Sequence, residues 1–158
     1  MENLLLSHFY FGFQFLILSF FYHSLFKEKL QRKVIVVLLI LCTSLLVIQY
    51  SLDWDLFFKF NLFEIFITSL PLIIYATFHL YNLLNEKKEF YYINIGLLIY
   101  LFGSTVVFLT ANLLLSLQTY DSFDIIYSLN VYLYVVYQLF ILYDVTTILK
   151  TNKKKSYE

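Results

Sequence analysis

The sequence predicts an all-α integral membrane bundle of five transmembrane helices, with the N-terminus outside and the C-terminus in the cytoplasm. Its composition excludes an ordinary soluble domain, because 61% of the 158 residues are hydrophobic and only 14% are charged. Five apolar stretches are each near or above the roughly 20 residues that cross a bilayer. They cover residues 4–26, 34–52, 57–84, 91–117 and 125–149. Short polar connections join them, so we expect a single transmembrane domain over residues 1–158.

The first two stretches differ in how many polar side chains they carry. Residues 4–26 lack the basic start and the small-residue cleavage site of a signal peptide, so we expect a retained span. Its polar side chains Ser7, Tyr10 and Gln14 form a short line that we expect to face other helices. Residues 34–52 are apolar nearly all round, and we predict that this span is the most exposed to lipid.

Each of the last three stretches gathers its polar side chains on one helical face, at 100° per residue. These are Glu64, Thr68, Pro71, Tyr75, His79 and Asn82 in the third, Asn94, Thr105, Asn112 and Ser116 in the fourth, and Tyr127, Asn130, Tyr134, Tyr137, Gln138 and Asp144 in the fifth. Pro71 lies in mid-span, where it removes a backbone hydrogen bond and favours a kink. Gly96 and Gly103 share the opposite face of the fourth stretch and predict a close helix approach there.

Basic residues occupy alternate connections, and this pattern predicts the orientation. The connections after the first and third spans and the tail hold most of the 11 basic residues: Lys27, Lys29, Arg32, Lys33, Lys87, Lys88, Lys150, Lys153, Lys154 and Lys155. The other two connections carry Asp53, Asp55, Asp121 and Asp124. Short basic loops stay on the cytoplasmic side, so the acidic connections are predicted to lie outside. A basic inner rim suits anionic lipid headgroups, and no nucleic-acid partner is implied.

Depth along the spans predicts two polar clusters. Measured from the loop boundaries at about 1.5 Å per residue, an outer cluster gathers at one height: His8, Glu64, Asn112 and Asn130. An inner cluster gathers near the cytoplasmic boundary: His79, Asn94 and Asp144. Carboxylates and histidines at two depths suit a proton relay or a small polar ligand cavity. The same groups also suit plain hydrogen bonding between helices, and the sequence leaves these alternatives open.

No catalytic motif is present, so we expect no enzyme activity and no catalytic residue. His23 and His79 both lie near cytoplasmic helix ends, and a haem held between them would fit geometrically. Polar side chains at helix ends commonly reach the interface instead, so we expect no cofactor. His8 and Glu64 supply two ligands where a metal site needs more, so we also expect no metal.

Three segments resemble small, uncharacterised polytopic inner-membrane proteins of the Bacteroidetes. They are EFYYINIGLLIYLFGSTVVFLTAN from Glu89, HFYFGFQFLILSFFYHSLF from His8 and NLFEIFITSLPLIIYATFHLYNLLNE from Asn61, and the likeness extends over residues 8–143. The matching positions are His8, Glu64, Asn94, Gly96, Tyr100, Gly103 and Asn112. Members of that group are similar to seven-span sensor-like modules that often occur with histidine kinases. The resemblance therefore implies a bacterial inner-membrane protein, and this chain departs from the longer members by two N-terminal spans.

Together these patterns favour a non-enzymatic membrane protein that senses or relays a signal through a protein partner. We expect the partner in the membrane or at the cytoplasmic face, because no effector domain is expected after Lys150. One alternative is a structural or accessory subunit of a larger membrane complex. A second is a small transporter or proton-conducting protein.

Overall fold

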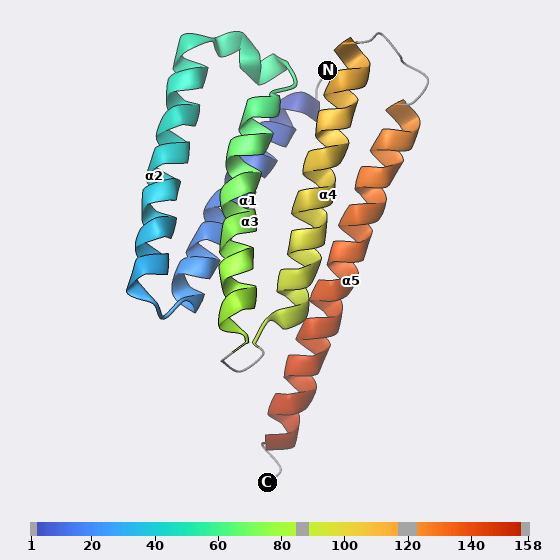
Figure 1. Ribbon diagram of the computed structural model, residues 1–158. Coiled ribbons are helices and arrows are strands. Elements are labelled where there is room, and N and C mark those ends of the chain that lie inside the picture. The colour runs from blue at the N-terminus through green and yellow to red at the C-terminus, as the bar shows by residue number, and fades with distance from the viewer. Residues whose placement is uncertain (1–2, 85–88, 117–122, 156–158) are drawn as a thin grey trace. The chain divides into compact units, whose positions relative to one another are not determined.

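A computed structural model describes residues 3–84, 89–116 and 123–155, and these residues contain helices and no strand (Figure 1). The helices are α1 (Asn3–Leu25), α2 (Lys29–Leu52), the short 3₁₀ helix η1 (Trp54–Phe58), α3 (Leu62–Asn82), α4 (Tyr91–Ser116) and α5 (Phe123–Lys155). All five α-helices are long and apolar enough to cross a membrane. The predicted class of five apolar spanning helices is confirmed. Residues Lys87, Lys88 and Asp121, which contribute to the predicted orientation, lie outside the described ranges.

Helix boundaries differ from the apolar stretches where polar or turn-forming residues decide them. The third span begins at Leu62 and not at 57, because the chain first turns through η1. Asp53 starts this turn, since its carboxylate accepts a hydrogen bond from the Asp55 backbone N–H at 3.1 Å. Helix α2 begins earlier than predicted, at Lys29, because lysine and arginine are good helix formers although they are not apolar.

Contacts divide the chain into two units, Met1–His79 and Leu80–Glu158, and each is described by itself. In the first unit, α3 turns its polar stripe inward. Glu64, Thr68, Pro71, Tyr75 and His79 are all buried. The Tyr75 hydroxyl donates to the backbone carbonyl of Ile35 on α2 at 3.4 Å. Helix α3 continues through Pro71 as one helix, and the kink stays a prediction.

The buried face of α1 is not the predicted line of Ser7, Tyr10 and Gln14, since Tyr10 is 41% exposed. Positions seven residues apart are buried instead: His8, Phe15 and Tyr22 in one row, and Ser19 and Phe26 in another. This is the spacing of a helix–helix seam, and large rings fill it. The Tyr22 ring lies 6.0 Å from that of Tyr75 on α3. Ring packing therefore set the orientation of α1, and the short polar residues did not.

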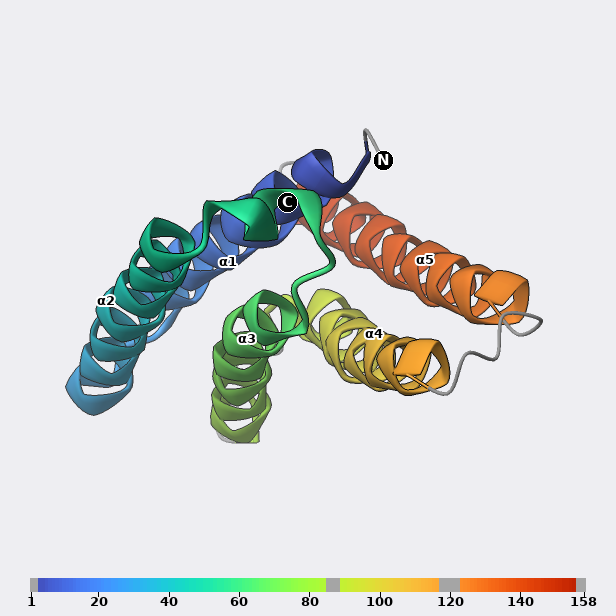
Figure 2. The ribbon, with the colours of Figure 1, turned by 90° about the horizontal axis from the view of Figure 1, so that it is seen from above.

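The second unit contains α4 and α5, which lie side by side in both views (Figures 1 and 2). The glycine face of α4 packs closely on α5; the sequence predicted a close approach there and did not specify the partner helix. A Cβ atom added at Gly96 would lie 2.6 Å from the Cβ of Phe140, and one added at Gly103 would lie 2.8 Å from a methyl group of Leu133. Between the two glycines, the ring of Tyr100 stacks on Tyr137 at 5.3 Å. Because glycine has no side chain, α4 and α5 can approach each other closely at Gly96 and Gly103.

Helix α5 is the least buried span, and the prediction that the second span would be the most exposed is wrong. Within the described residues, 6% of the α5 span is buried inside the protein, against 17% of the α2 span. The prediction failed because α2 is uniformly apolar yet buries Ile35 and Cys42 against its neighbours. Helix α5 carries a polar stripe on one face, but much of the apolar surface on its other faces is not covered by the described part of the second unit.

Candidate functional site

A buried network of an imidazole, a carboxylate and a phenol joins the first three helices. His8 of α1 bonds through Nδ1 to Oε2 of Glu64 on α3. The Tyr50 hydroxyl of α2 donates to the same Glu64 oxygen at 2.7 Å and lies 3.0 Å from His8 Nδ1. His8 and Glu64 are both buried. We call these three residues, with Asn61, the His8 network.

Local structure at the start of α3 places Glu64 in this network. Asn61 precedes the helix, and its side-chain oxygen accepts from the Glu64 backbone N–H at 3.2 Å, which is a standard N-cap bond. Asn61 also donates to the Tyr50 hydroxyl at 3.2 Å and to Gln49 at 3.2 Å. The cap fixes Glu64 in the first helical turn, where the helix dipole favours a negative charge.

Aromatic rings enclose the network on the side of η1. The Phe57 ring stacks on Tyr50 with centroids 4.2 Å apart, and its edge meets the His8 ring at 6.1 Å. Trp54 lies next in line, 5.0 Å from Phe57. The 3₁₀ turn therefore places apolar surface over the polar groups. Exclusion of water by such surface strengthens hydrogen bonds and ion pairs beneath it.

One ring nitrogen of His8 has no partner in the described part of the chain. Nε2 is buried and makes no hydrogen bond, whereas Nδ1 is engaged by Glu64 and Tyr50. A carboxylate at Nδ1 favours a proton on that nitrogen, and in that tautomer Nε2 carries a lone pair. Buried polar atoms are nearly always satisfied. This nitrogen is therefore the position in the network that is open to a further hydrogen bond.

The structure brings together two members of the predicted outer cluster, His8 and Glu64. The other two belong to the second unit. Asn112 on α4 is exposed, and Asn130 on α5 is half-buried with a buried side-chain oxygen that lacks a partner. The association of these two asparagines with His8 and Glu64 stays a prediction.

In the predicted inner cluster, Asp144 acts on the start of α4. Its Oδ2 accepts a hydrogen bond from the backbone N–H of Ile93 at 3.2 Å, in the first turn of α4. Phe90, the residue before that helix, has no side-chain acceptor, so Asp144 supplies the cap from α5. Asn94 is buried beside Ile93. His79 belongs to the first unit, where its ring lies 6.2 Å from Tyr22 and 6.4 Å from Phe26, and its association with Asp144 stays a prediction.

Replacing Asp144 by alanine is expected to destabilise the α4–α5 pair by about 1 kcal/mol, the usual cost of losing a helix cap. Asp144→Asn keeps an acceptor oxygen and should cost less than half as much. The free energy of unfolding in mixed micelles measures both. Equal costs for the two variants would show that the negative charge, and not the cap bond, is what α4 requires.

Sequence reasoning missed Tyr50, Asn61 and Gln49. Gln49 and Tyr50 lie at the end of the second span, which was described only as apolar nearly all round. Asn61 lies inside the stretch 57–84 that was predicted to be the third span, although α3 begins only after it. A signal for Asn61 was present. The Asn-x-x-Glu spacing of Asn61 and Glu64 is typical of a helix N-terminus, which would have moved the start of α3 and placed Tyr50 at the height of Glu64.

Among the described residues, no group of three or more His, Cys, Asp and Glu side chains is placed to hold a metal ion. His8 and Glu64 bond to each other. His79 packs against aromatic rings of α1, and His23 on the same helix is half-buried. The expectation that no cofactor binds at His23 and His79 stays a prediction.

The fold and site have the character of a multi-pass, all-helical membrane protein with a buried imidazole–carboxylate–phenol network across its first three helices. Comparison with family models, curated proteins and solved structures finds no match to this chain.

Proposed function

We propose that the chain is a non-enzymatic membrane protein that senses or relays a signal through a partner, and that the His8 network is the part that changes state. The observation that carries the proposal is the buried, unpartnered Nε2 of His8. Buried polar atoms are nearly always paired, so the unpaired Nε2 supports a role in which the network gains a hydrogen-bond partner or a proton. The resemblance to sensor-like inner-membrane proteins of the Bacteroidetes supports the same function and a bacterial inner-membrane location.

Uptake of a proton at Nε2 would change the bonding between three helices. The titratable groups that face His8 are Glu64 of α3 and Tyr50 of α2, and the Phe57 ring of η1 adds none. A cationic His8 would attract the Glu64 carboxylate more strongly and compete with Tyr50 for it. Because the three groups come from different helices, this competition would shift α2 relative to α1 and α3.

The charge pattern supports an orientation for this response. The connection between α1 and α2 is basic, whereas the residues next to the His8 network at η1 include Asp53 and Asp55. By the rule that basic loops remain in the cytoplasm, the network lies on the extracytoplasmic side. The signal would then come from outside the cell, and the partner would receive it through the helices.

Trp54 provides a direct test, since it is the only tryptophan and lies beside Phe57 of the network. In proteoliposomes, we expect its fluorescence to change as the pH on the side of the acidic loops is varied between 5 and 8, the range in which histidine changes charge. His8→Gln should abolish the change. His23→Gln, at the opposite end of α1, should retain it.

Two results would contradict the proposal. A pH response that persists in His8→Gln would place the titrating group elsewhere, and a response only to the pH on the basic side would reverse the orientation. The partner is tested by purification from native membranes in mild detergent. A stoichiometric protein that is retained by the wild type and released by Glu64→Gln would link the network to the relay.

The alternative of an accessory subunit is favoured by a different observation. Tyr50, Asn61 and Glu64 of the network bond to one another and join α2 to the start of α3, and α5 exposes a long apolar surface. A flat fluorescence response, together with a partner retained equally by the wild type and Glu64→Gln, would establish this function in place of sensing.

A further inference from the structure

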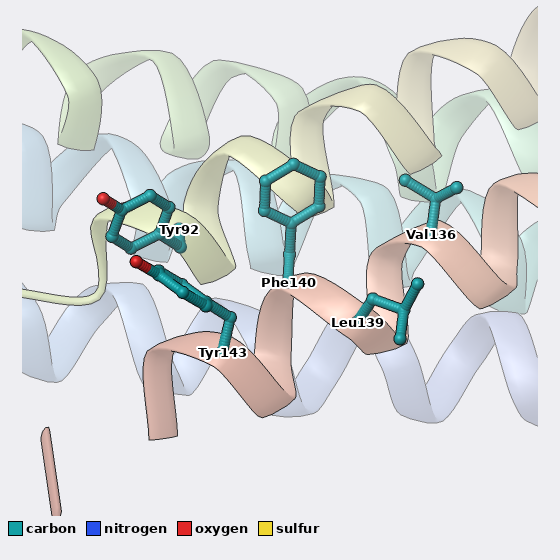
Figure 3. A pocket seen from close by; sticks show the side chains of 5 residues that line it. All are labelled: Tyr92, Val136, Leu139, Phe140 and Tyr143. Atoms are coloured by element: carbon teal, nitrogen blue, oxygen red, sulfur yellow. The ribbon is translucent and has the colours of Figure 1, made fainter. Parts of the chain in front are cut away.

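An open groove runs along the second unit between α4 and α5. Its volume is about 420 Å³, within the range of small-molecule sites. Tyr92 of α4 and four residues of α5 line it: Val136, Leu139, Phe140 and Tyr143 (Figure 3). Apart from the two tyrosine hydroxyls, the side chains that line the groove are apolar.

The spacing of the lining residues sets the direction of the groove. Val136, Leu139, Phe140 and Tyr143 follow the positions i, i+3, i+4 and i+7 of one helix face. The groove therefore extends along the axis of α5 for about 10 Å, at 1.5 Å per residue. A groove parallel to a membrane-spanning helix is parallel to the acyl chains of the bilayer. Its shape suits an extended hydrocarbon chain.

Polar groups mark one end of the groove. The rings of Tyr92 and Tyr143 meet edge to face at 4.7 Å, and their hydroxyls point the same way (Figure 3). Tyr92 lies at the start of the α4 span. Tyrosines of this kind favour the boundary between hydrocarbon and headgroups. This end of the groove is therefore the end nearer the membrane surface.

A cation follows on the same face. Lys150 lies seven residues beyond Tyr143, which places it two turns further along the same side of α5. It is exposed and ends the apolar part of the helix. Helix α5 continues without interruption to Lys155, so the position of Lys150 relative to the groove is fixed by the helix itself. Further lysines follow at 153, 154 and 155.

We propose that this groove binds one acyl chain of an anionic phospholipid, with the tyrosine hydroxyls near the ester region and the phosphate at Lys150. An apolar channel, a hydroxyl pair and a cation occur in the order in which a phospholipid presents its chain, its esters and its phosphate. Charge complementarity selects an anionic lipid over a zwitterionic one, since each lysine near the surface favours anionic lipid by a factor of about five. The groove and the His8 network belong to different units of the chain.

Native mass spectrometry of the full chain in detergent tests the site, with phosphatidylglycerol and phosphatidylcholine of identical acyl chains as probes. The wild type should retain phosphatidylglycerol at least fivefold more than phosphatidylcholine. Lys150→Gln should reduce that preference about fivefold. Leu139→Trp should fill the groove and reduce retention of both lipids, whereas Leu142→Trp should not, because Leu142 is equally exposed on α5 but does not line the groove.

Equal retention of the two lipids by the wild type would overturn the proposal, as would an unchanged preference in Lys150→Gln. Glycerol 3-phosphate should not compete at the same concentration. Competition by it would show a phosphate site without an acyl chain. Circular dichroism and a single elution peak establish that each variant is folded. If Leu139→Trp does not fold, Lys150→Gln still tests the proposal, because it changes only an exposed side chain.

Discussion

Glu64→Ala is expected to lower the free energy of unfolding by about 3 kcal/mol, the largest effect of any single change at the His8 network. The substitution leaves the buried Nδ1 of His8 and the Tyr50 hydroxyl without their shared acceptor. Each stranded donor keeps its desolvation penalty. Glu64→Gln retains an acceptor oxygen and should cost about 1 kcal/mol. Reversible unfolding in mixed micelles, followed by circular dichroism, measures both variants.

A double-mutant cycle separates the network from general helix packing. Tyr50→Phe alone should cost about 1 kcal/mol, and in the Glu64→Ala background it should cost clearly less, because the bond to Glu64 is already gone, although the bond accepted from Asn61 remains to be lost. Thr43→Ala is the matched control on α2. The Thr43 hydroxyl is exposed and bonds only to the carbonyl of Leu39 in its own helix, so the change should be nearly neutral. Additive costs for Tyr50 and Glu64 would refute the shared bond.

Gly96→Ala is expected to destabilise the α4–α5 pair by about 2 kcal/mol through overpacking. The new methyl group would lie 2.6 Å from the Cβ of Phe140, an atom that side-chain rotation cannot move away. The helices must separate to accept it. Unfolding in mixed micelles measures the loss, and energy transfer between dyes on α4 and α5 measures the separation.

The other two glycines provide graded controls. At Gly103 the added methyl group would meet the terminal methyl of Leu133 at 2.8 Å, which can rotate, so Gly103→Ala should cost less than 1 kcal/mol. At Gly12 nothing lies within 4 Å, and Gly12→Ala should gain about 0.5 kcal/mol from helix propensity. An equal effect at all three positions would mean that propensity, and not the α4–α5 contact, decides the outcome.

Hydropathy was sufficient for the spans, because a stretch of about 20 apolar residues has no stable alternative to a helix in a bilayer. It failed at residues 57–61, where aromatic residues of the η1 turn extend the apolar stretch and the Asn61 cap then starts α3. Helical periodicity placed the inward face of α3 and the glycine face of α4 correctly. It misjudged α1, since the burial of that helix follows the rings of Phe15, Tyr22 and Phe26 and not its short polar residues.

The candidate site was predictable in part. His8 and Glu64 were selected as polar groups at one depth, and they do meet. Tyr50 was missed because a phenol at a helix end is common in any membrane protein and has no distinguishing spacing. Asp144 was selected for its burial, yet its bond to the Ile93 N–H could not be foreseen, because that bond depends on how far α5 extends past the start of α4.

Composition and periodicity are enough to establish that the chain forms apolar helices of spanning length, which face of α3 is inward, which face of α4 allows a close approach, and where charge is concentrated. These are local properties of periodicity and composition. The predicted inward polar stripe of α4 is not found, since Asn112 is exposed. The tertiary structure decided which polar groups share a proton-bearing network, which nitrogen of His8 is left unpaired, and where the lining of a groove meets a lysine. Such outcomes depend on the relative height and rotation of neighbouring helices, and the packing of side chains along their seams sets both.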